Sequence, residues 1–193
     1  MSQSNVSHDS STETLAATAR LFGRLLVREL DAQTLEELQQ SDVRNALAEV
    51  GIDVPQAEQL DELAHDWLSC FLHPESMTPP VHSLYRHGSY DGDAAAAVRG
   101  IASTAGLEQA AGARNAAPDH IGSILVLWAE LTEQRPDLAR LLAEQHTEWA
   151  EAALQPAIAE PDRAFYASVA RATCELLPAI REHSSATFPA PSV

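Results

Sequence analysis

The chain has 193 residues, enough for one domain with a sizeable hydrophobic core. It is strongly acidic, because 28 Asp and Glu residues face only 12 basic residues, all of them Arg, and the formal net charge is −16. Such a surface repels nucleic acid and anionic lipid and attracts cationic partners. An acid-rich proteome or adaptation to salt explains the charge equally well. The charge therefore argues against nucleic acid and anionic lipid as partners, but it does not identify the partner.

The cysteines and the N-terminal residues bear on the compartment. Cys70 and Cys174 lie far apart and form no Cys-x-x-Cys motif, which predicts two buried thiols in a reducing compartment. Residues 1–11 have neither the basic nor the apolar region of an export signal. The apolar run at 124–129 is far shorter than the ~20 residues that span a bilayer. We therefore expect a cytoplasmic protein without stable membrane insertion.

Helical periodicity begins close to the N-terminus. Ser10-x-x-Glu13 has the pattern of a capping box and predicts a helix start, preceded by a disordered tail over residues 1–10. An apolar stripe with spacings of three and four follows. Its members are Leu15, Ala19, Phe22, Leu26 and Leu30.

Three more helices are predicted before residue 73. Asp31 is expected to cap a short helix that runs to about Gln40, and Ser41 to cap another that stops at Gly51. Pro55 opens a longer helix with a marked apolar stripe. The stripe comprises Leu60, Leu63, Ala64, Trp67, Leu68 and Phe71.

Residues 73–93 form the longest stretch without periodicity. His73-Pro74 is expected to end the preceding helix, and the stretch is rich in Pro, Gly, His and Tyr. A loop of this length within a compact domain is usually functional or mobile.

Helical patterns resume at Asp93, extend over 94–102 and return weakly over 107–115. Asp119 is expected to cap the most apolar helix of the chain, which runs to about Gln134. Pro136 opens the next helix. Its marked positions are Leu138, Leu141, Leu142, His146 and Trp149.

Pro161 opens the last predicted helix, and Pro178 is expected to kink or end it. Its apolar positions are Phe165, Val169, Ala172, Leu176 and Leu177. Residues 184–193 are predicted to form a flexible tail. No segment alternates with a period of two, so the sequence predicts an all-α, single-domain bundle of eight to ten helices over residues 11–183.

Motifs for catalysis, metals and nucleotides are missing from the sequence. The eight His residues show no spacing typical of a metal site. There is no nucleophile elbow and no glycine-rich phosphate loop. Asp119 and His120 could pair as orienter and base, but neighbours at a helix start usually point in different directions. We expect no catalytic residue, no metal and no cofactor.

Aromatic residues gather around the 73–93 loop and allow two interpretations. Trp67, Phe71, Tyr85 and Tyr90 bracket this loop, although the chain has only ten aromatic residues. Trp67 and Phe71 lie one helical turn apart and could simply pack the core. The functional interpretation is a groove with an aromatic floor and an acidic rim, suited to a peptide with cationic and apolar residues.

Two motifs resemble a known family. The first is Asp66-Trp67-Leu68-Ser69-Cys70-Phe71-Leu72-His73-Pro74, followed by Pro80-Val81-His82-Ser83 and Tyr85; the second is Pro118-Asp119-His120-Ile121-Gly122, which opens an apolar helix. A weaker match is His146-x-x-Trp149 with Phe165-Tyr166. Together, over residues 60–180, they are similar to the TorD/DmsD group of molybdoenzyme-specific maturation chaperones, to which NarJ-type proteins are related. His73, Val81 and Ile124 depart from the family pattern, which concerns the subfamily and its client.

The resemblance implies a cytoplasmic, all-helical, non-catalytic chaperone, either monomeric or homodimeric. It would bind the twin-arginine signal peptide or apoprotein of a molybdenum-cofactor oxidoreductase of the DMSO or TMAO reductase type until cofactor insertion. Carboxylates such as Asp66 and Asp119 can hold Arg in bidentate contacts, and Leu72 adds apolar surface. The peptide-binding residues expected from the motifs are Asp66, Trp67, Phe71, Pro80, Ser83, Tyr85, Pro118, Asp119, His120 and Gly122.

Two alternatives to this function stay open at the level of the sequence. The first is a NarJ-like assembly factor for a nitrate reductase-type enzyme, which binds an N-terminus that is not exported. The second and more remote one is a small hydrolase or a GTP-binding protein that uses the Asp119-His120 corner. Guanine nucleotide binding has been linked to some relatives, but no phosphate loop supports it in this sequence.

Overall fold

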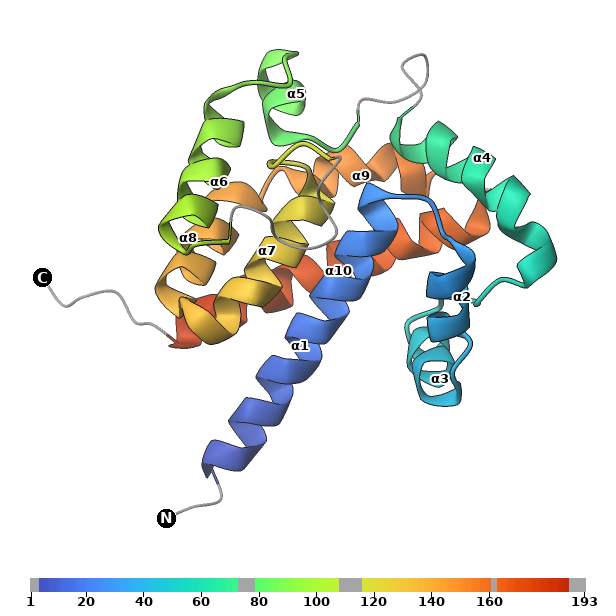
Figure 1. Ribbon diagram of the computed structural model, residues 1–193, viewed down its shortest axis with the longest axis horizontal. Helices are drawn as coiled ribbons and strands as arrows, with labels where there is room; N and C mark the ends of the chain where they lie inside the picture. The colour runs from blue at the N-terminus through green and yellow to red at the C-terminus, as the bar shows by residue number, and fades with distance from the viewer. Residues whose placement is uncertain (1–3, 73–78, 108–115, 161–162, 188–193) are drawn as a thin grey trace, which may run out of the picture.

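The computed structural model describes the backbone of residues 4–72, 79–107, 116–160 and 163–187 (Figure 1). Within these ranges the chain forms ten α-helices and one short 3₁₀ helix, and the only β pairing is a single bridge. The predicted all-α fold is confirmed. No helix in the described ranges is both long and apolar enough to cross a bilayer.

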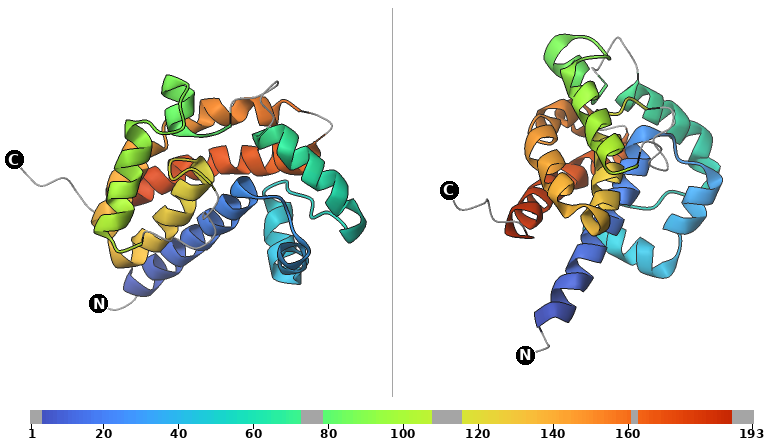
Figure 2. Two further views of the ribbon diagram at one scale, coloured as in Figure 1. Left: turned by 45° about the horizontal axis from the view of Figure 1, so that its top comes forward. Right: turned by 60° about the vertical axis from the view of Figure 1, so that its left-hand side comes forward.

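Helices α1 (Ser4–Val27) and α7 (Ile121–Gln134) lie side by side, and the N-terminal part of α1 extends beyond the other helices (Figure 1, Figure 2). Every residue of α7 from Ile121 to Ala129 is buried, in agreement with its apolar sequence. Helix α1 begins six residues before Ser10, so the predicted start at the capping box is wrong. Residues 4–9 contain no Pro or Gly, and nothing in their sequence stops the helix from extending.

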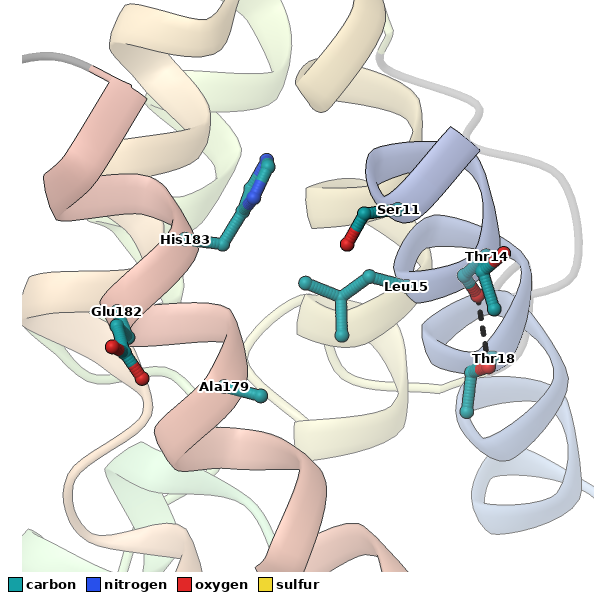
Figure 3. A pocket seen from close by; sticks show the side chains of 7 residues that line it. All are labelled: Ser11, Thr14, Leu15, Thr18, Ala179, Glu182 and His183. Carbon is teal, nitrogen blue, oxygen red and sulfur yellow. Dashed lines mark hydrogen bonds between the residues drawn. The ribbon is translucent and has the colours of Figure 1, made fainter. Parts of the chain in front are cut away.

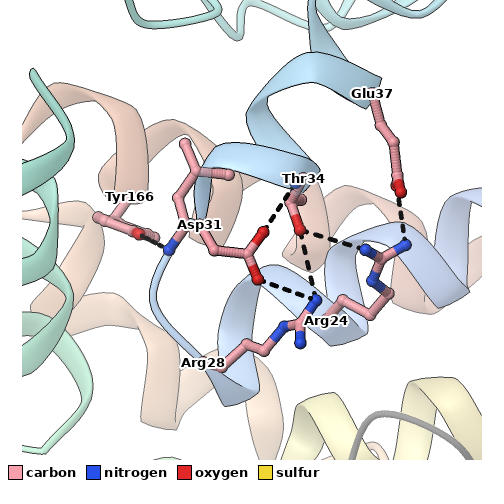
Figure 4. Close-up of polar contacts among 7 residues, drawn as sticks. Arg24, Arg28, Asp31, Thr34, Glu37 and Tyr166 are labelled. Carbon is pink, nitrogen blue, oxygen red and sulfur yellow. Dashed lines mark hydrogen bonds and ion pairs between the residues drawn. The ribbon is translucent and has the colours of Figure 1, made fainter. Parts of the chain in front are cut away.

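The connection from α1 to α2 (Ala32–Leu38) is fixed by polar contacts (Figure 4). Asp31 caps α2 as predicted, since its Oδ1 accepts a 2.7 Å hydrogen bond from the Thr34 amide. That hydrogen bond lowers the pKa of Asp31 below its ordinary value. Arg24 and Arg28 both donate to the Thr34 hydroxyl, and buried Tyr166 accepts from the Leu30 amide at 3.1 Å.

Helices α3 (Ser41–Glu49) and α4 (Leu60–Phe71) follow, with a 3₁₀ turn, η1 (Ala57–Gln59), immediately before α4. Ser41 does not cap α3, because Gln40 occupies the cap position and makes no side-chain hydrogen bond there. Gly51 ends this region as predicted, with a φ of 75° that favours glycine. The helix expected to open at Pro55 begins later, and its predicted end at His73-Pro74 lies outside the described residues.

The predicted loop over 73–93 contains a helix, α5 (His82–His87), directly before α6 (Asp93–Thr104). Six residues are too few to show helical periodicity in a sequence. Gly88 ends α5 with a φ of 69°. The start of α6 at Asp93 is confirmed, whereas the weak pattern over 107–115 lies almost entirely outside the described residues.

Helices α8 (Pro136–His146), α9 (Ala150–Ile158) and α10 (Ala164–Thr187) complete the bundle. Helix α9 was not predicted as a separate element, because the pattern of α8 was extended through Trp149 and α9 contains Pro156. Helix α10 passes through Pro178 without ending there, so the predicted tail is helical over residues 184–187. The remaining tail residues and the predicted helix start at Pro161 lie outside the described ranges.

Candidate functional site

Two chain segments that carry the sequence motifs meet between α5 and α7. The His82 amide donates to the Asp119 carbonyl at 3.0 Å, and the Ile121 amide donates to the Pro80 carbonyl at 2.9 Å, which makes one antiparallel bridge. Pro80, and Pro118 on the other segment, favour extended backbone around them. We call these two segments, residues 79–83 and 117–122, the joint.

Asp119 is completely buried in the joint and holds the start of α5. Its Oδ2 accepts a 2.7 Å hydrogen bond from the Ser83 amide, one of the free N–H groups in the first turn of α5. Its Oδ1 has no hydrogen-bond partner among the described residues. The prediction that Asp119 caps its own helix, α7, is wrong, because this carboxylate caps α5 from another part of the chain.

His120 caps α7 in place of Asp119. The ring Nδ1 accepts a 3.1 Å hydrogen bond from the Gly122 amide, so this nitrogen carries no proton in the folded protein. The side chain is 6% exposed, and burial lowers the pKa of His120 to about 4, against a smaller opposing effect of Asp119. A neutral imidazole in this position serves as a hydrogen-bond acceptor for the backbone.

Gly122 lies where α7 crosses α1. A Cβ atom at Gly122 would stand 2.6 Å from the Gly23 carbonyl oxygen, and a Cβ atom at Gly23 would stand 2.6 Å from the Gly122 carbonyl oxygen. Only glycine fits on both sides of such a close approach of two helix backbones. Gly23 was not among the predicted site residues, although a glycine within the apolar α1 pattern is a signal for close packing.

A cluster of three rings forms around His82 of the joint, and none of its three residues was among the predicted peptide-binding residues. The ring of His82 stacks on Trp149 with a centroid distance of 5.0 Å and an angle of 9°, and it meets the edge of His146 at 5.6 Å. Burial, followed by the charge effect of His146, lowers the pKa of His82 to about 4. Burial also lowers the pKa of His146. The side chains therefore stay neutral and pack as rings near neutral pH.

Ser83 connects the joint to α6, and Tyr85 lies at the surface beside it. The Ser83 hydroxyl accepts from the Ala95 amide at 3.3 Å, and a Cβ atom at Gly92 would stand 2.8 Å from the same oxygen. Tyr85 is 45% exposed and lies 5.9 Å from the ring of Trp149. Of the predicted residues in this segment, Tyr85 alone is exposed, since Pro80 and Ser83 are buried.

Trp67 and Phe71 are core residues. The Trp67 indole donates to the Leu26 carbonyl at 3.3 Å, and the Phe71 ring meets the edge of Tyr166 at 5.8 Å. Both are buried, so they do not form the exposed aromatic floor considered from the sequence. Asp66, on the same helix, is partly buried and faces Arg163, with its Oδ1 3.8 Å from the Arg163 Nε. Burial raises the pKa of Asp66, and the charge of Arg163 opposes that effect.

An open cavity of about 650 Å³ lies elsewhere, between α1 and α10 (Figure 3). It contains no residue of the joint and no predicted peptide-binding residue. Its lining residues are Ser11, Thr14, Leu15, Thr18, Ala179, Glu182 and His183. The described part of the chain holds no group of three or more His, Cys, Asp or Glu residues suited to bind a metal ion.

Comparison with known proteins gives the family. Residues 13–165 match the family model described as nitrate reductase delta subunit. The chain belongs to this family. No curated protein sequence matches the chain significantly.

Membership of the nitrate reductase delta subunit family confirms the resemblance to NarJ-related maturation chaperones. The family consists of maturation chaperones rather than catalysts, and this member is accordingly an assembly chaperone for a molybdoenzyme. The matched range includes both motifs and the whole joint. The structure gives Asp119, His120 and Gly122 structural roles, and their predicted contact with a client peptide stays a prediction.

Proposed function

We propose that this nitrate reductase delta family member binds the N-terminal segment of the catalytic subunit of a nitrate reductase-type molybdoenzyme. The observation that carries the proposal is the family match over residues 13–165. The chaperone acts in the cytoplasm and holds the apoprotein until its molybdenum cofactor is inserted. It contributes no catalytic residue and no cofactor of its own.

The charge of the chain supports a client segment that contains Arg or Lys. The net charge of −16 attracts a cationic segment and accelerates its encounter with the chaperone. This attraction decreases with salt, because ions screen exposed charges over about 10 Å at 0.1 M.

A second candidate client is the twin-arginine leader of an exported DMSO or TMAO reductase-type precursor. Its support is the Pro118-Asp119-His120-Ile121-Gly122 motif, which resembles the TorD/DmsD pattern. The two clients differ in one chemical feature, since only the leader requires a pair of adjacent arginines.

Isothermal titration distinguishes the two clients. One peptide comprises the first 20 residues of the host's nitrate reductase catalytic subunit, and the other is the twin-arginine leader of a host molybdoenzyme precursor. We expect the first to bind more tightly. Tighter binding of the leader, lost when its two arginines become glutamines, would transfer the proposal to the second client. No binding of either peptide or of the full-length apoproteins would contradict the chaperone function proposed for this chain.

A further inference from the structure

Helix α4 has a stripe of exposed residues on the side that faces away from the core. Asp61, His65 and Leu68 follow one another at spacings of four and three, which places them on one face of α4, and Leu72, the C-cap residue that ends the helix, follows after another four residues. All four residues are exposed. The stripe is about 16 Å long at 1.5 Å per residue. Helix α4 lies at the edge of the molecule in Figure 1 and Figure 2. We call these four residues the α4 stripe.

The C-terminal half of the stripe is apolar. Leu68 is 43% exposed and Leu72 is 47% exposed, and they lie one helical turn apart. The other large exposed apolar side chains in the described ranges are Val50, Tyr85 and Tyr90, none of which lies on a helix face beside another of them. Single exposed apolar residues are ordinary, but two adjacent leucines offer a continuous apolar contact.

The N-terminal half of the stripe consists of Asp61 and His65, and two further carboxylates lie close to Asp61 in the sequence. Asp61 and Glu62 lie in the first turn of α4, and Glu58 precedes them in η1. All three are exposed, and none forms an ion pair with a described residue. Asp66, by contrast, already has Arg163 as its partner. These three exposed carboxylates can attract a cation from outside the chain.

We propose that the α4 stripe docks a segment of the client chain that carries cationic side chains at one end and apolar side chains at the other. This inference rests on the proposed function and deepens it by naming the surface. The cationic end contacts Asp61 and Glu62, and the apolar end covers Leu68 and Leu72. Asp61 and Leu68 are seven residues apart, about 10 Å along the helix axis. An extended client segment spans this distance with about three residues and a helical one with about seven.

The two halves of the stripe contribute differently to binding. Exposed ion pairs add little affinity each, because water and salt screen them. Burial of apolar surface supplies most of the affinity, and the acidic residues orient the segment and accelerate its approach. Loss of the leucines should therefore weaken binding much more than loss of the carboxylates.

The test uses the full-length protein and the 20-residue N-terminal peptide of the host's nitrate reductase catalytic subunit. The double substitution Leu68→Glu with Leu72→Glu should raise the dissociation constant of the peptide at least tenfold. The matched control is Ala96→Glu with Gly100→Glu, which adds the same two charges at two exposed positions one turn apart on α6. We expect the control to bind within twofold of the wild type, and circular dichroism verifies that both variants are folded.

A second pair of substitutions tests the acidic end. Asp61→Asn with Glu62→Gln preserves the size of both side chains and removes their charges. The dissociation constant should rise about two- to fivefold at low salt, and the dependence of binding on salt concentration should become shallower. An unchanged salt dependence would contradict the proposed contact with the cationic end.

The outcomes separate this inference from the proposed function. If the wild type binds the peptide and the leucine variant binds it equally well, the function stands and the placement on α4 is overturned. If the wild type binds neither the peptide nor the apoprotein, the proposed function itself fails. If the leucine substitutions instead dissociate a dimer of this chain and leave peptide binding unchanged, a second copy covers the stripe and the inference is overturned.

Discussion

The joint between α5 and α7 and the α4 stripe both contain residues of the sequence motifs, but they differ in burial. In the joint, Asp119 is fully buried and its carboxylate holds the start of another helix. On the α4 stripe, Leu68 and Leu72 are exposed and the nearby carboxylates Asp61 and Glu62 have no partner among the described residues. Residue types predicted peptide binding at the joint, whereas burial gives the joint a role in stability and leaves the exposed α4 stripe as the surface that we propose for recognition.

The largest expected effect on stability is at the close contact between Gly122, the last residue of the joint, and Gly23 of α1. Gly122→Val should lower the free energy of unfolding by about 3 kcal/mol, because its Cβ atom would stand 2.6 Å from the Gly23 carbonyl oxygen and force α1 and α7 apart. Urea denaturation measures the change. The control is Gly100→Ala in α6, where an added Cβ atom meets nothing within 4 Å and should stabilise the protein by about 0.5–1 kcal/mol. Equal effects at the two positions would show that the close crossing is not important for stability.

A smaller loss is expected at the buried carboxylate. Asp119→Ala leaves the buried Ser83 amide without an acceptor and should lower the free energy of unfolding by about 2 kcal/mol. Asp119→Asn retains an oxygen acceptor and should lose less. Asp91→Ala, at a side chain that is 87% exposed, should change stability by less than about 0.5 kcal/mol. Similar values for Asp119→Ala and Asp91→Ala would contradict the structural role of the joint.

The sequence predicts contacts between residues that are close together in the chain, but not contacts between distant residues such as those of the joint. The capping of α2 by Asp31 was predicted correctly, because Asp31 and Thr34 lie three residues apart and the pattern is visible in the sequence. The role of Asp119 was not predicted, since its partner Ser83 is 36 residues away and belongs to a helix too short to show periodicity.

The α4 stripe shows that the sequence also does not reveal which apolar residues of a helix are buried. Leu68 was grouped with Trp67 and Phe71 in one apolar pattern, but Leu68 is exposed in the folded protein whereas the other two are buried. Periodicity identifies the helix correctly, and only tertiary structure shows that Leu68 lies outside the buried face. The stacking of His82 on Trp149 depends in the same way on two segments that are far apart in the sequence.

The pH dependence of stability tests the buried histidine of the joint. The pKa of His120 is about 4 in the folded protein and about 6.5 when unfolded. The unfolded state therefore binds the proton first, and the stability present above pH 6.5 is lost progressively as the pH falls toward 4. From pH 7.5 to 5.5 this residue should lower the free energy of unfolding by about 1.4 kcal/mol.

His120→Asn isolates that contribution. Asn can accept the Gly122 hydrogen bond through its side-chain oxygen and is a favoured N-cap, but it does not titrate. Urea denaturation at pH 7.5 and 5.5 should show a loss of stability about 1.4 kcal/mol smaller in His120→Asn than in the wild type. Equal losses would mean that His120 is not held neutral in the folded protein.

The smallest effect on stability is expected at the exposed leucines. Leu68→Glu with Leu72→Glu should lower the free energy of unfolding by only about 1 kcal/mol, because each side chain is already about half exposed and the main cost is the placement of two negative charges at the C-terminal end of α4. Thermal and urea denaturation of this variant and of Gly122→Val would measure how much the α4 stripe and the joint each contribute to stability. A loss of several kcal/mol would show that the leucines belong to the core and not to a recognition surface.

The most direct test compares both regions in one binding experiment. Isothermal titration with the N-terminal peptide of the nitrate reductase catalytic subunit is performed on Asp119→Asn and on Leu68→Glu with Leu72→Glu. We expect Asp119→Asn to bind within twofold of the wild type and the leucine variant to bind at least tenfold more weakly. Tenfold weaker binding of folded Asp119→Asn, with wild-type binding by the leucine variant, would contradict this expectation and place the client site at the joint.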